Sequence, residues 1–313
     1  MSGPDEFEAI ARLFRPLTRG APEALGLQDD AAAIPARPGY DLIVTKDAVV
    51  EGVHFPIGEA PDLAARKLLR VNLSDLAAKA AEPYGYFLAV SWPPSWDAAA
   101  RESFVRGLDE DGRTFGLVLL GGDTTSTPGP MMASVTMLGW VPAGGMVRRG
   151  GARPGDLVLV SGPIGDGLLG LMAARGELAE PELEHRYRVP QPRLDLRDAL
   201  RAHVSAAADI SDGLIADAGH IAEASGAAIT LRLEALPLSD GARRWLAGAG
   251  DKAEALLRLA SGGDDYQIVC TAPPQAAAGL GLTVIGEVAE GTGVRVLLEG
   301  RTLDPGAGGW VHR

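Results

Sequence analysis

The sequence predicts an α/β fold of mixed α+β type, arranged as two domains. Strand-like and helix-like segments alternate in both halves of the chain, the pattern expected of sheets packed with helices. The chain has 313 residues, and at about 150 residues per domain this length indicates roughly two domains. Residues 142–155 contain five glycines, two prolines and no apolar periodicity, so we place the boundary there. We expect an N-terminal domain at 1–141 and a C-terminal domain at 142–313.

The first domain begins with a predicted helix at 5–18, where apolar residues recur at helical spacing behind acids in the first turn. The β-branched segment 41–50 predicts a strand. Residues 61–82 predict a helix that is interrupted by the sequence NLSD at 72–75. The other elements expected here are strands at 86–92, 115–120 and 131–141, a helix at 97–112, and a loop at 121–130.

The second domain begins with a predicted strand at 156–162, which runs into a glycine-rich turn and a helix at 167–176. The sequence PQPR at 190–193 predicts a rigid break. A segment at 204–213 ends in DISDG and leads into a helix at 214–225. The remaining expected elements are a strand at 227–233, a helix at 254–260, a loop at 261–267 leading into a strand that ends at 270, and a strand at 282–288.

Composition excludes several classes of protein. An apolar content of 46% is too high for a disordered chain. The net charge of −12 comes without a basic stripe, so we expect no nucleic-acid partner. Cys270 is the only cysteine, which excludes an internal disulfide framework and fits a reducing compartment. The acidic N-terminal segment and the lack of a long apolar run lead us to expect a cytoplasmic protein with no membrane partner.

Aspartates in this chain fall in loops beside apolar strands rather than along helix faces. Surface acids usually spread over helices and pair with Lys or Arg, whereas an uncompensated carboxylate beside an apolar strand is costly. Each one alone is equally compatible with an N-cap or an Asx turn. A helix N-cap needs only one acid, whereas Asp29 and Asp30 stand side by side and Asp209 and Asp212 are three positions apart. The set as a whole therefore indicates a functional role. It comprises Asp29, Asp30, Asp47, Asp75, Asp123, Asp209, Asp212, Asp264 and Asp265.

This pattern is typical of a site for nucleotide phosphates and several Mg²⁺ ions. Mg²⁺ prefers oxygen ligands and bridges carboxylates to substrate phosphates. Glycines precede two of the acids, in the sequences GGD at 121–123 and 262–264, where phosphate oxygens can approach backbone amides. The site is not a Walker site, because the chain contains no G-x-x-x-x-G-K-[ST] sequence.

An alternative comes from Gly165, Gly167 and Gly170, which form a G-x-G-x-x-G sequence between a strand and a helix. This is the context of a dinucleotide-binding loop. A ribose-binding acid is then expected about 20 residues on, at the end of a second strand. The chain has a charged, proline-broken stretch there, so close helix–strand packing or another phosphate at the helix N-terminus is favoured.

Nine motifs, read in order, resemble those of the thiamine-monophosphate kinase family. They cover nearly the whole chain, and several are shared with the wider superfamily of aminoimidazole ribonucleotide synthetase and selenophosphate synthetase. The combination of EGVHF with SDGLIADAGHI is specific to the kinase. The motifs are GLQDDAA (26–32), TKD with EGVHF (45–55), NLSDLAA (72–78), GGDTT (121–125), RRGGARPGD (148–156), SGPIGDGLLG (161–170), PQPR (190–193), DISDGLIADAGHIAEASG (209–226) and SGGDDYQI (261–268).

The resemblance implies a homodimer formed through the N-terminal sheet and a C-terminal α/β domain. It also implies Mg²⁺-assisted transfer of the γ-phosphoryl group of ATP to thiamine monophosphate, with Asp30, Asp75, Asp123 and Asp212 as the catalytic acids. The acceptor is already a phosphate, so the reaction needs cations and positioning more than a strong base. The metal ligands implied are Asp30, Thr45, Asp47, Asp75, Asp123, Asp209 and Asp212.

The resemblance further implies nucleotide and substrate contacts. Three of these residues also have a simpler structural explanation. His54 could be a packed histidine, Trp310 a terminal hydrophobic plug, and Arg149 a solvated charge. Trp310 would stack on a cationic thiazolium ring. The nucleotide contacts implied are Gly122, Asp123, Arg149 and Ser211, and the substrate contacts implied are His54, Asp264 and Trp310.

Departures from the family pattern leave two other functions open. Lys46 stands where the family has a hydroxyl residue, and Asp264 is one methylene shorter than the usual glutamate. Gln28, Lys79 and Ala80 also differ from the usual residues, but no core acid is missing. The alternatives are a superfamily sibling with another acceptor and a nucleotide-binding sensor without turnover.

Overall fold

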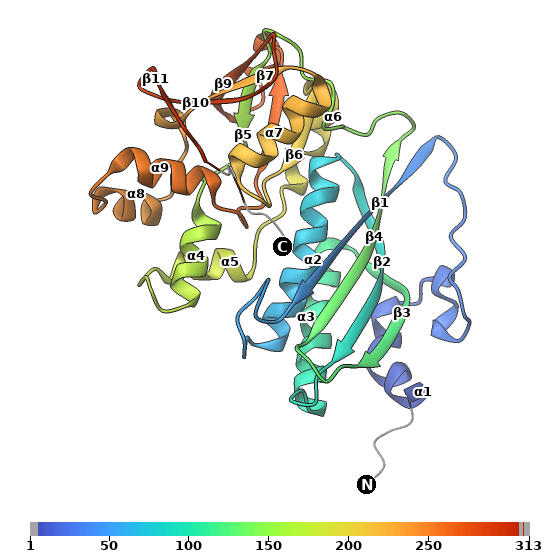
Figure 1. Cartoon of the computed structure of the whole chain (residues 1–313). Helices are drawn as coiled ribbons and strands as arrows, with labels where there is room; N and C mark the ends of the chain where they lie inside the picture. Colours follow the sequence, from blue (N-terminus) through green and yellow to red (C-terminus); the bar gives the residue numbers. More distant parts are fainter. Residues whose placement is uncertain (1–5, 307–308, 310–313) are drawn as a thin grey trace. The chain divides into compact units, whose positions relative to one another are not determined.

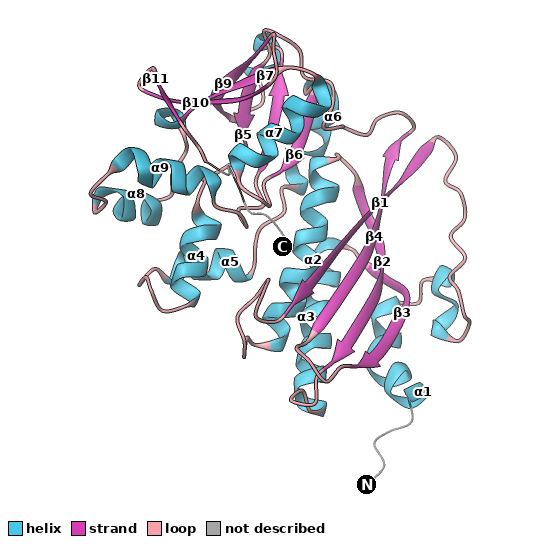
Figure 2. Cartoon of the chain, in the orientation of Figure 1, coloured by secondary structure: helices cyan, strands magenta, loops and turns pink. Residues whose placement is uncertain are grey.

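The computed structural model describes residues 6–306 and 309 and divides into two compact units. Unit 1 comprises residues 1–76 and 81–144, and unit 2 comprises residues 77–80 and 145–313. Each unit is a sheet with helices, which confirms the predicted α/β, mixed α+β class (Figures 1 and 2). The domain boundary at 141–142 stays a prediction from the sequence.

Unit 1 is built on a four-stranded sheet of order β1-β4-β2-β3. The pairs β1–β4 and β2–β4 are antiparallel, and β3 adds to the edge parallel to β2. Buried positions predominate along β4, at the centre of the sheet. The strands are β1 (Tyr40–Val50), β2 (Glu82–Trp92), β3 (Val118–Ser126) and β4 (Met132–Pro142).

Two long helices, α2 (Pro61–Ala78) and α3 (Ala98–Phe115), lie on the same side of this sheet (Figure 1). Gly107 of α3 meets the backbone of Asp62 so closely that an added Cβ would lie 2.3 Å from the Asp62 carbonyl oxygen. Only glycine permits this approach of α3 to the start of α2. The shorter helical segments of unit 1 are α1 (Glu6–Ala9), a π-helical turn (Ile10–Phe14) and 3₁₀ turns at Arg15–Thr18 and Pro22–Leu27.

The structure corrects three predictions for this unit. The expected helix at 5–18 changes type repeatedly, as the proline at 16 makes an unbroken helix unfavourable. The predicted interruption at 72–75 is absent, because the Asn72 amide donates to the Leu68 carbonyl inside a continuous α2. The predicted loop at 121–130 is strand as far as Ser126, because Gly121–Ser126 pairs with β2.

Unit 2 is built on a seven-stranded sheet of order β11-β10-β7-β9-β5-β8-β6. β7 and β10 are parallel, and the other neighbours are antiparallel. Aliphatic side chains such as Val158, Ile210 and Ile229 are fully buried in its main core. The strands are β5 (Leu157–Val160), β6 (Ala206–Asp209), β7 (Ala228–Arg232), β8 (Ile268–Ala272), β9 (Thr283–Ala289), β10 (Gly293–Leu298) and β11 (Arg301–Leu303).

The helices of unit 2 include four that the sequence analysis missed, namely α5, α6, α8 and α10. They are short, so each offers only one or two turns in which an apolar period can repeat. Strands β10 and β11 were also missed. Among the described residues, no helix is long and apolar enough to cross a membrane. The helices are α4 (Asp166–Ala174), α5 (Pro181–Arg188), α6 (Arg197–His203), α7 (Leu214–Ser225), α8 (Asp240–Ala247), α9 (Lys252–Ser261) and α10 (Pro274–Ala277), with 3₁₀ turns at Leu194–Leu196 and Leu233–Ala235.

A buried ion pair in unit 1 generates a prediction about stability. Arg70 of α2 binds the Asp111 carboxylate of α3 through two hydrogen bonds of 2.6 and 2.8 Å, and both side chains are buried. We expect Asp111→Ala to lower the free energy of unfolding by about 3–5 kcal/mol, because it removes the carboxylate that binds the buried Arg70 guanidinium. Urea denaturation measures this loss.

The matched control is Glu102→Ala, which removes the exposed pair between Glu102 and Arg12. A surface pair of this kind contributes about 0–1 kcal/mol. Equal losses for the Asp111 and Glu102 variants would show that burial does not decide the strength of these pairs.

Candidate active site

Three of the predicted metal ligands of unit 1 lie along β1 and α2. The Thr45 hydroxyl of β1 donates a short hydrogen bond to the Asp75 carboxylate of α2. Two residues further along β1, the Asp47 amide donates to the Asn72 side-chain oxygen at 3.1 Å. Asn72 and Asp75 are three positions apart on a helix, so both face the same strand. The Asp47 carbonyl also accepts a hydrogen bond from Ser134 at 3.1 Å.

Two further predicted ligands of unit 1, Asp30 and Asp123, line one cavity of about 770 Å³. Both residues are exposed. The cavity is lined both by polar residues, which include Thr124, and by aromatic and aliphatic residues, with Gly122 also in the wall. The apolar lining includes Ile10, Phe14, Leu27, Phe87 and Leu119.

Gly122 is required at the cavity wall by the fold itself. A Cβ at this position would lie 1.9 Å from the Leu88 carbonyl oxygen of the neighbouring strand. Close pairing of β3 with β2 therefore accounts for this glycine without any ligand. Its predicted contact with a phosphate stays a prediction.

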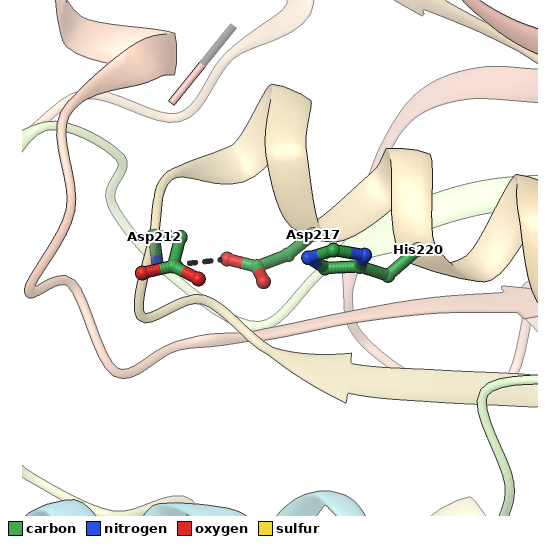
Figure 3. Close-up of side chains that lie close together, drawn as sticks. All are labelled: Asp212, Asp217 and His220. Carbon is green, nitrogen blue, oxygen red and sulfur yellow. Dashed lines mark hydrogen bonds between the residues drawn. The ribbon is translucent and has the colours of Figure 1, made fainter. Parts of the chain in front are cut away.

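Unit 2 presents the remaining acids on one strand–turn–helix segment (Figure 3). Asp209 ends β6 and is buried, Ser211 and Asp212 form the turn, and α7 begins at Leu214. The Asp217 carboxylate, on α7, accepts the amide hydrogens of both Ser211 and Asp212 through Oδ2, each at 3.1 Å. This pair of hydrogen bonds fixes the turn that carries two predicted site residues.

Asp217 itself is only 1% exposed, and its Oδ1 atom has no hydrogen-bond partner in the part of the chain that the structure describes. Burial raises the pKa of Asp217 to about 7, and the neighbouring Asp212 charge adds to this effect. The two amides and the charge of Arg149 act in the opposite direction. A buried acceptor without a partner costs about 1–3 kcal/mol, so this carboxylate is poorly compensated.

Asp212, Asp217 and His220 form a compact group in which one ligand atom from each lies within 4.8 Å of the others. Figure 3 shows the Asp217 carboxylate between Asp212 and the imidazole ring. Among the residues that the structure describes, the other predicted metal ligands do not form a group of three at this spacing. Asp30, Asp75 and Asp123 therefore belong to no such group of three among the described residues of unit 1.

The glycine-rich turn before α4 is occupied by a carboxylate of the chain. Asp265 accepts the amide hydrogens of Gly165 and Gly167 at 2.8 Å, one on each oxygen. At Gly167 a Cβ would lie 2.3 Å from the Asp264 backbone. These amides are the ones that a dinucleotide phosphate would use. The alternative of a dinucleotide loop therefore loses its phosphate site, and close packing explains the glycine.

His54 has a local role in the turn after β1. Its Nδ1 atom accepts the Val50 amide hydrogen at 3.1 Å, and its own amide donates to the Val50 carbonyl at 2.9 Å. The neutral ring therefore carries its proton on Nε2. The imidazole is half-buried, and contact with a substrate stays a prediction.

Asp264 and Tyr266 both adopt left-handed backbone conformations, with φ of 67° and 49°. The Tyr266 hydroxyl donates to the Asp264 carboxylate at 2.8 Å, which holds the short side chain in place. Arg149 is exposed. Trp310, the third predicted substrate contact, lies outside the described residues.

Two residues of the site, Asp217 and His220, were not recognised in the sequence, and Asp265 was predicted only as a member of the aspartate set. Asp217 and His220 stand three positions apart on a helix, a D-x-x-H spacing that places both on one face. That spacing was the available signal. Asp265 was noticed only as the second acid of a pair, and nothing local shows that it binds amides 100 residues away.

Comparison with known proteins bears on the identity of the chain. Residues 28–141 match the family "AIR synthase related protein, N-terminal domain", and residues 153–299 match "AIR synthase related protein, C-terminal domain". The chain is 57% identical to the thiamine-monophosphate kinase of Caulobacter vibrioides over 99% of this chain and 91% of that protein.

Solved structures agree with these matches. The thiamine-monophosphate kinase of Stenotrophomonas maltophilia superposes with a TM-score of 0.82 at 36% identity, covering 95% of this chain and 98% of that one. AaThiL complexed with AMPPCP and TMP superposes with a TM-score of 0.78 at 31% identity, covering 87% of both chains.

The two-unit fold and the matched segments define a protein of the AIR synthase-related class. Within that class, the chain belongs to the thiamine-monophosphate kinase family. The predicted enzyme class, a kinase, is confirmed.

The buried Asp265 carboxyl leads to a prediction about pH. Burial raises its pKa to about 8, although the amides of Gly165 and Gly167 lower it. The unfolded chain loses this proton near pH 4, whereas the folded protein keeps it until about pH 8. The unfolding free energy contributed by this group therefore falls as pH rises between these values.

We expect Asp265→Asn to remove that fall. The unfolding free energy of wild type minus that of the variant should therefore decrease from pH 5 to pH 8. Denaturant unfolding across this pH range measures this difference. Asp198→Asn, at an exposed acid, is the control. A difference, wild type minus variant, that stays constant or increases with pH would contradict the raised pKa.

Proposed function

We propose that this protein transfers the γ-phosphoryl group of ATP to the phosphate of thiamine monophosphate. A bond forms between an oxygen of the acceptor phosphate and the γ-phosphorus, the bond from that phosphorus to the bridging oxygen breaks, and ADP leaves with thiamine diphosphate. The observation that carries the proposal is the 57% identity to a thiamine-monophosphate kinase over nearly the whole chain. A related structure is a complex with AMPPCP and TMP, which supports the same pair of substrates.

The donor set of the candidate site fits Mg²⁺. Thr45 and Asp75 already join a hydroxyl to a carboxylate, and hard oxygen atoms of this kind are the ligands that Mg²⁺ prefers. When bound, the ions would neutralise charge that two phosphate reactants bring to a chain of net charge −12. The residues proposed to hold them are Asp30, Thr45, Asp47, Asp75, Asp123, Asp209 and Asp212.

The other residues of each unit position these ligands. Asn72 and Ser134 fix the backbone of Asp47, so Lys46 at the preceding position does not disturb its placement. Lys46 turns away and donates to Thr136 at 3.3 Å. Asp217 fixes the turn of Ser211 and Asp212 in the same manner.

We propose that the cavity beside Asp30 and Asp123 takes part of the nucleotide. Its apolar lining residues suit a base, and its lining also includes Gly122 and the two acids that would hold the phosphate-bound cations. Arg149 and Ser211 are the further nucleotide contacts proposed from unit 2.

The proposed contacts to thiamine monophosphate are His54, Asp264 and Trp310. The Tyr266 hydroxyl donates to Asp264 and holds this side chain, which is one methylene shorter than the usual glutamate. The cytoplasmic location predicted from the sequence is retained as part of the proposal.

We propose a homodimer formed through the sheet of unit 1. Leu42 and Val44 are 38% and 56% exposed, and they stand at alternate positions of β1. Met132 of β4 lies on the same face and is 43% exposed. A second copy of this face would cover these apolar side chains.

Val44→Asp places a charge on that face, so we expect it to convert a dimer into a monomer in light scattering. Val284→Asp makes the same change at an exposed valine of β9 and serves as the control. A dimer that survives Val44→Asp, or a wild-type monomer, would rule out this interface.

The reaction is tested by incubating the protein with Mg²⁺ and ATP and identifying products by ³¹P NMR. We expect ADP and thiamine diphosphate when thiamine monophosphate is present and no ADP without it. A sensor would bind ATP without releasing ADP, and a superfamily sibling would need another acceptor.

Asp75→Asn and Asp212→Asn each remove one negative ligand of the proposed cations. We expect each to lower kcat by about 100-fold or more, while the melting temperature stays unchanged or rises. Asp198→Asn is again the exposed control. Full activity in Asp212→Asn would remove this residue from the proposed machinery.

A further inference from the structure

Asp217 carries a buried oxygen atom that has no hydrogen-bond partner among the described residues. Its Oδ2 atom is saturated by the amide hydrogens of Ser211 and Asp212, whereas Oδ1 has no hydrogen bond although the side chain is only 1% exposed. Buried acceptors are almost always paired, so the exception points to a partner outside the described residues, such as a water molecule or a bound cation. This observation is independent of the acidic character of the surroundings.

The surroundings of that carboxylate are those of a ligand set. Asp212 comes from the turn and His220 from the exposed side of α7, and their ligand atoms lie within 4.8 Å of each other and of Asp217. Figure 3 shows the carboxylate lying between the other two side chains. Two carboxylates so close together repel each other unless a proton or a cation lies between them.

We propose that Asp212, Asp217 and His220 form a binding site for a divalent cation of the first transition row. Two carboxylate oxygens and one imidazole nitrogen suit Mn²⁺, Co²⁺ or Zn²⁺, whereas Mg²⁺ takes oxygen ligands almost alone. The two amides on Oδ2 orient the carboxylate so that Oδ1 is the ligand atom. A small closing movement of the exposed His220 completes the set.

This inference shares Asp212 with the magnesium ligands of the proposed function, but it does not rest on catalysis. Binding of the cation is measured without ATP or thiamine monophosphate. A protein that is fully active as a kinase yet binds no cation through His220 would overturn this inference alone.

The probe is Co²⁺ added to the full chain without nucleotide, in excess Mg²⁺ so that sites made of oxygen alone are filled. Visible absorption gives the affinity for Co²⁺, and ¹H NMR detects the strongly shifted N–H proton of an imidazole bound to Co²⁺. We expect one shifted N–H signal in the wild-type protein.

Two variants test the ligands. His220→Ala, at an exposed position, should remove the shifted signal, whereas His203→Ala, at the exposed end of α6, should keep it. Asp217→Asn keeps an oxygen that can accept both amides but loses the charge, so we expect Co²⁺ to bind about tenfold more weakly or worse.

Three results would overturn the proposal: no shifted imidazole signal in the wild-type protein, a signal that persists in His220→Ala, or unchanged Co²⁺ affinity in Asp217→Asn. The first result is also what a proton shared by the two carboxylates, or a His220 imidazolium, would produce.

Discussion

Compensation of buried and half-buried carboxylates is the constraint on which both units depend. Asp111 is paired with Arg70, Asp75 accepts from a threonine hydroxyl, and Asp265 accepts two amides at the start of α4. Each solution joins elements distant in sequence, so the donor that stabilises the charge also fixes the packing. A carboxylate without such donors would be costly where these side chains lie.

Whether both carboxyl oxygens have a hydrogen-bond donor separates structural acids from candidate functional ones. Asp265 uses both oxygens on amides of its own chain, which explains the glycine-rich turn without a ligand. Asp217 uses one oxygen and leaves the other unpaired beside Asp212. Asp30 and Asp123 are exposed at a cavity, where solvent or a bound ligand reaches them. The hydrogen-bond donors around an aspartate therefore indicate whether it has a structural role or is a candidate ligand.

The local sequence predicted the bounds of an element correctly where glycines with positive φ mark its ends. The helix at 214–225 has the expected bounds, because Gly213 and Gly226, with φ of 116° and 62°, flank it. The predicted break at 72–75 was wrong, because Asn72 finds a partner within the helix and Asp75 finds one on β1. Resemblance supplied the family and candidate acids, but the role of Asp265 depends on a contact between residues 100 positions apart, which no local pattern encodes.

The central proposal is that aspartates such as Asp75 in unit 1 and Asp212 in unit 2 bind divalent cations that neutralise the phosphates of the reactants. Anomalous diffraction from crystals of the full chain with Mn²⁺, a non-hydrolysable ATP analogue and thiamine monophosphate tests it most directly. The account predicts manganese peaks bound by the carboxylates of Asp75 and Asp212. A structure with the analogue bound, and with manganese on neither carboxylate, would contradict it.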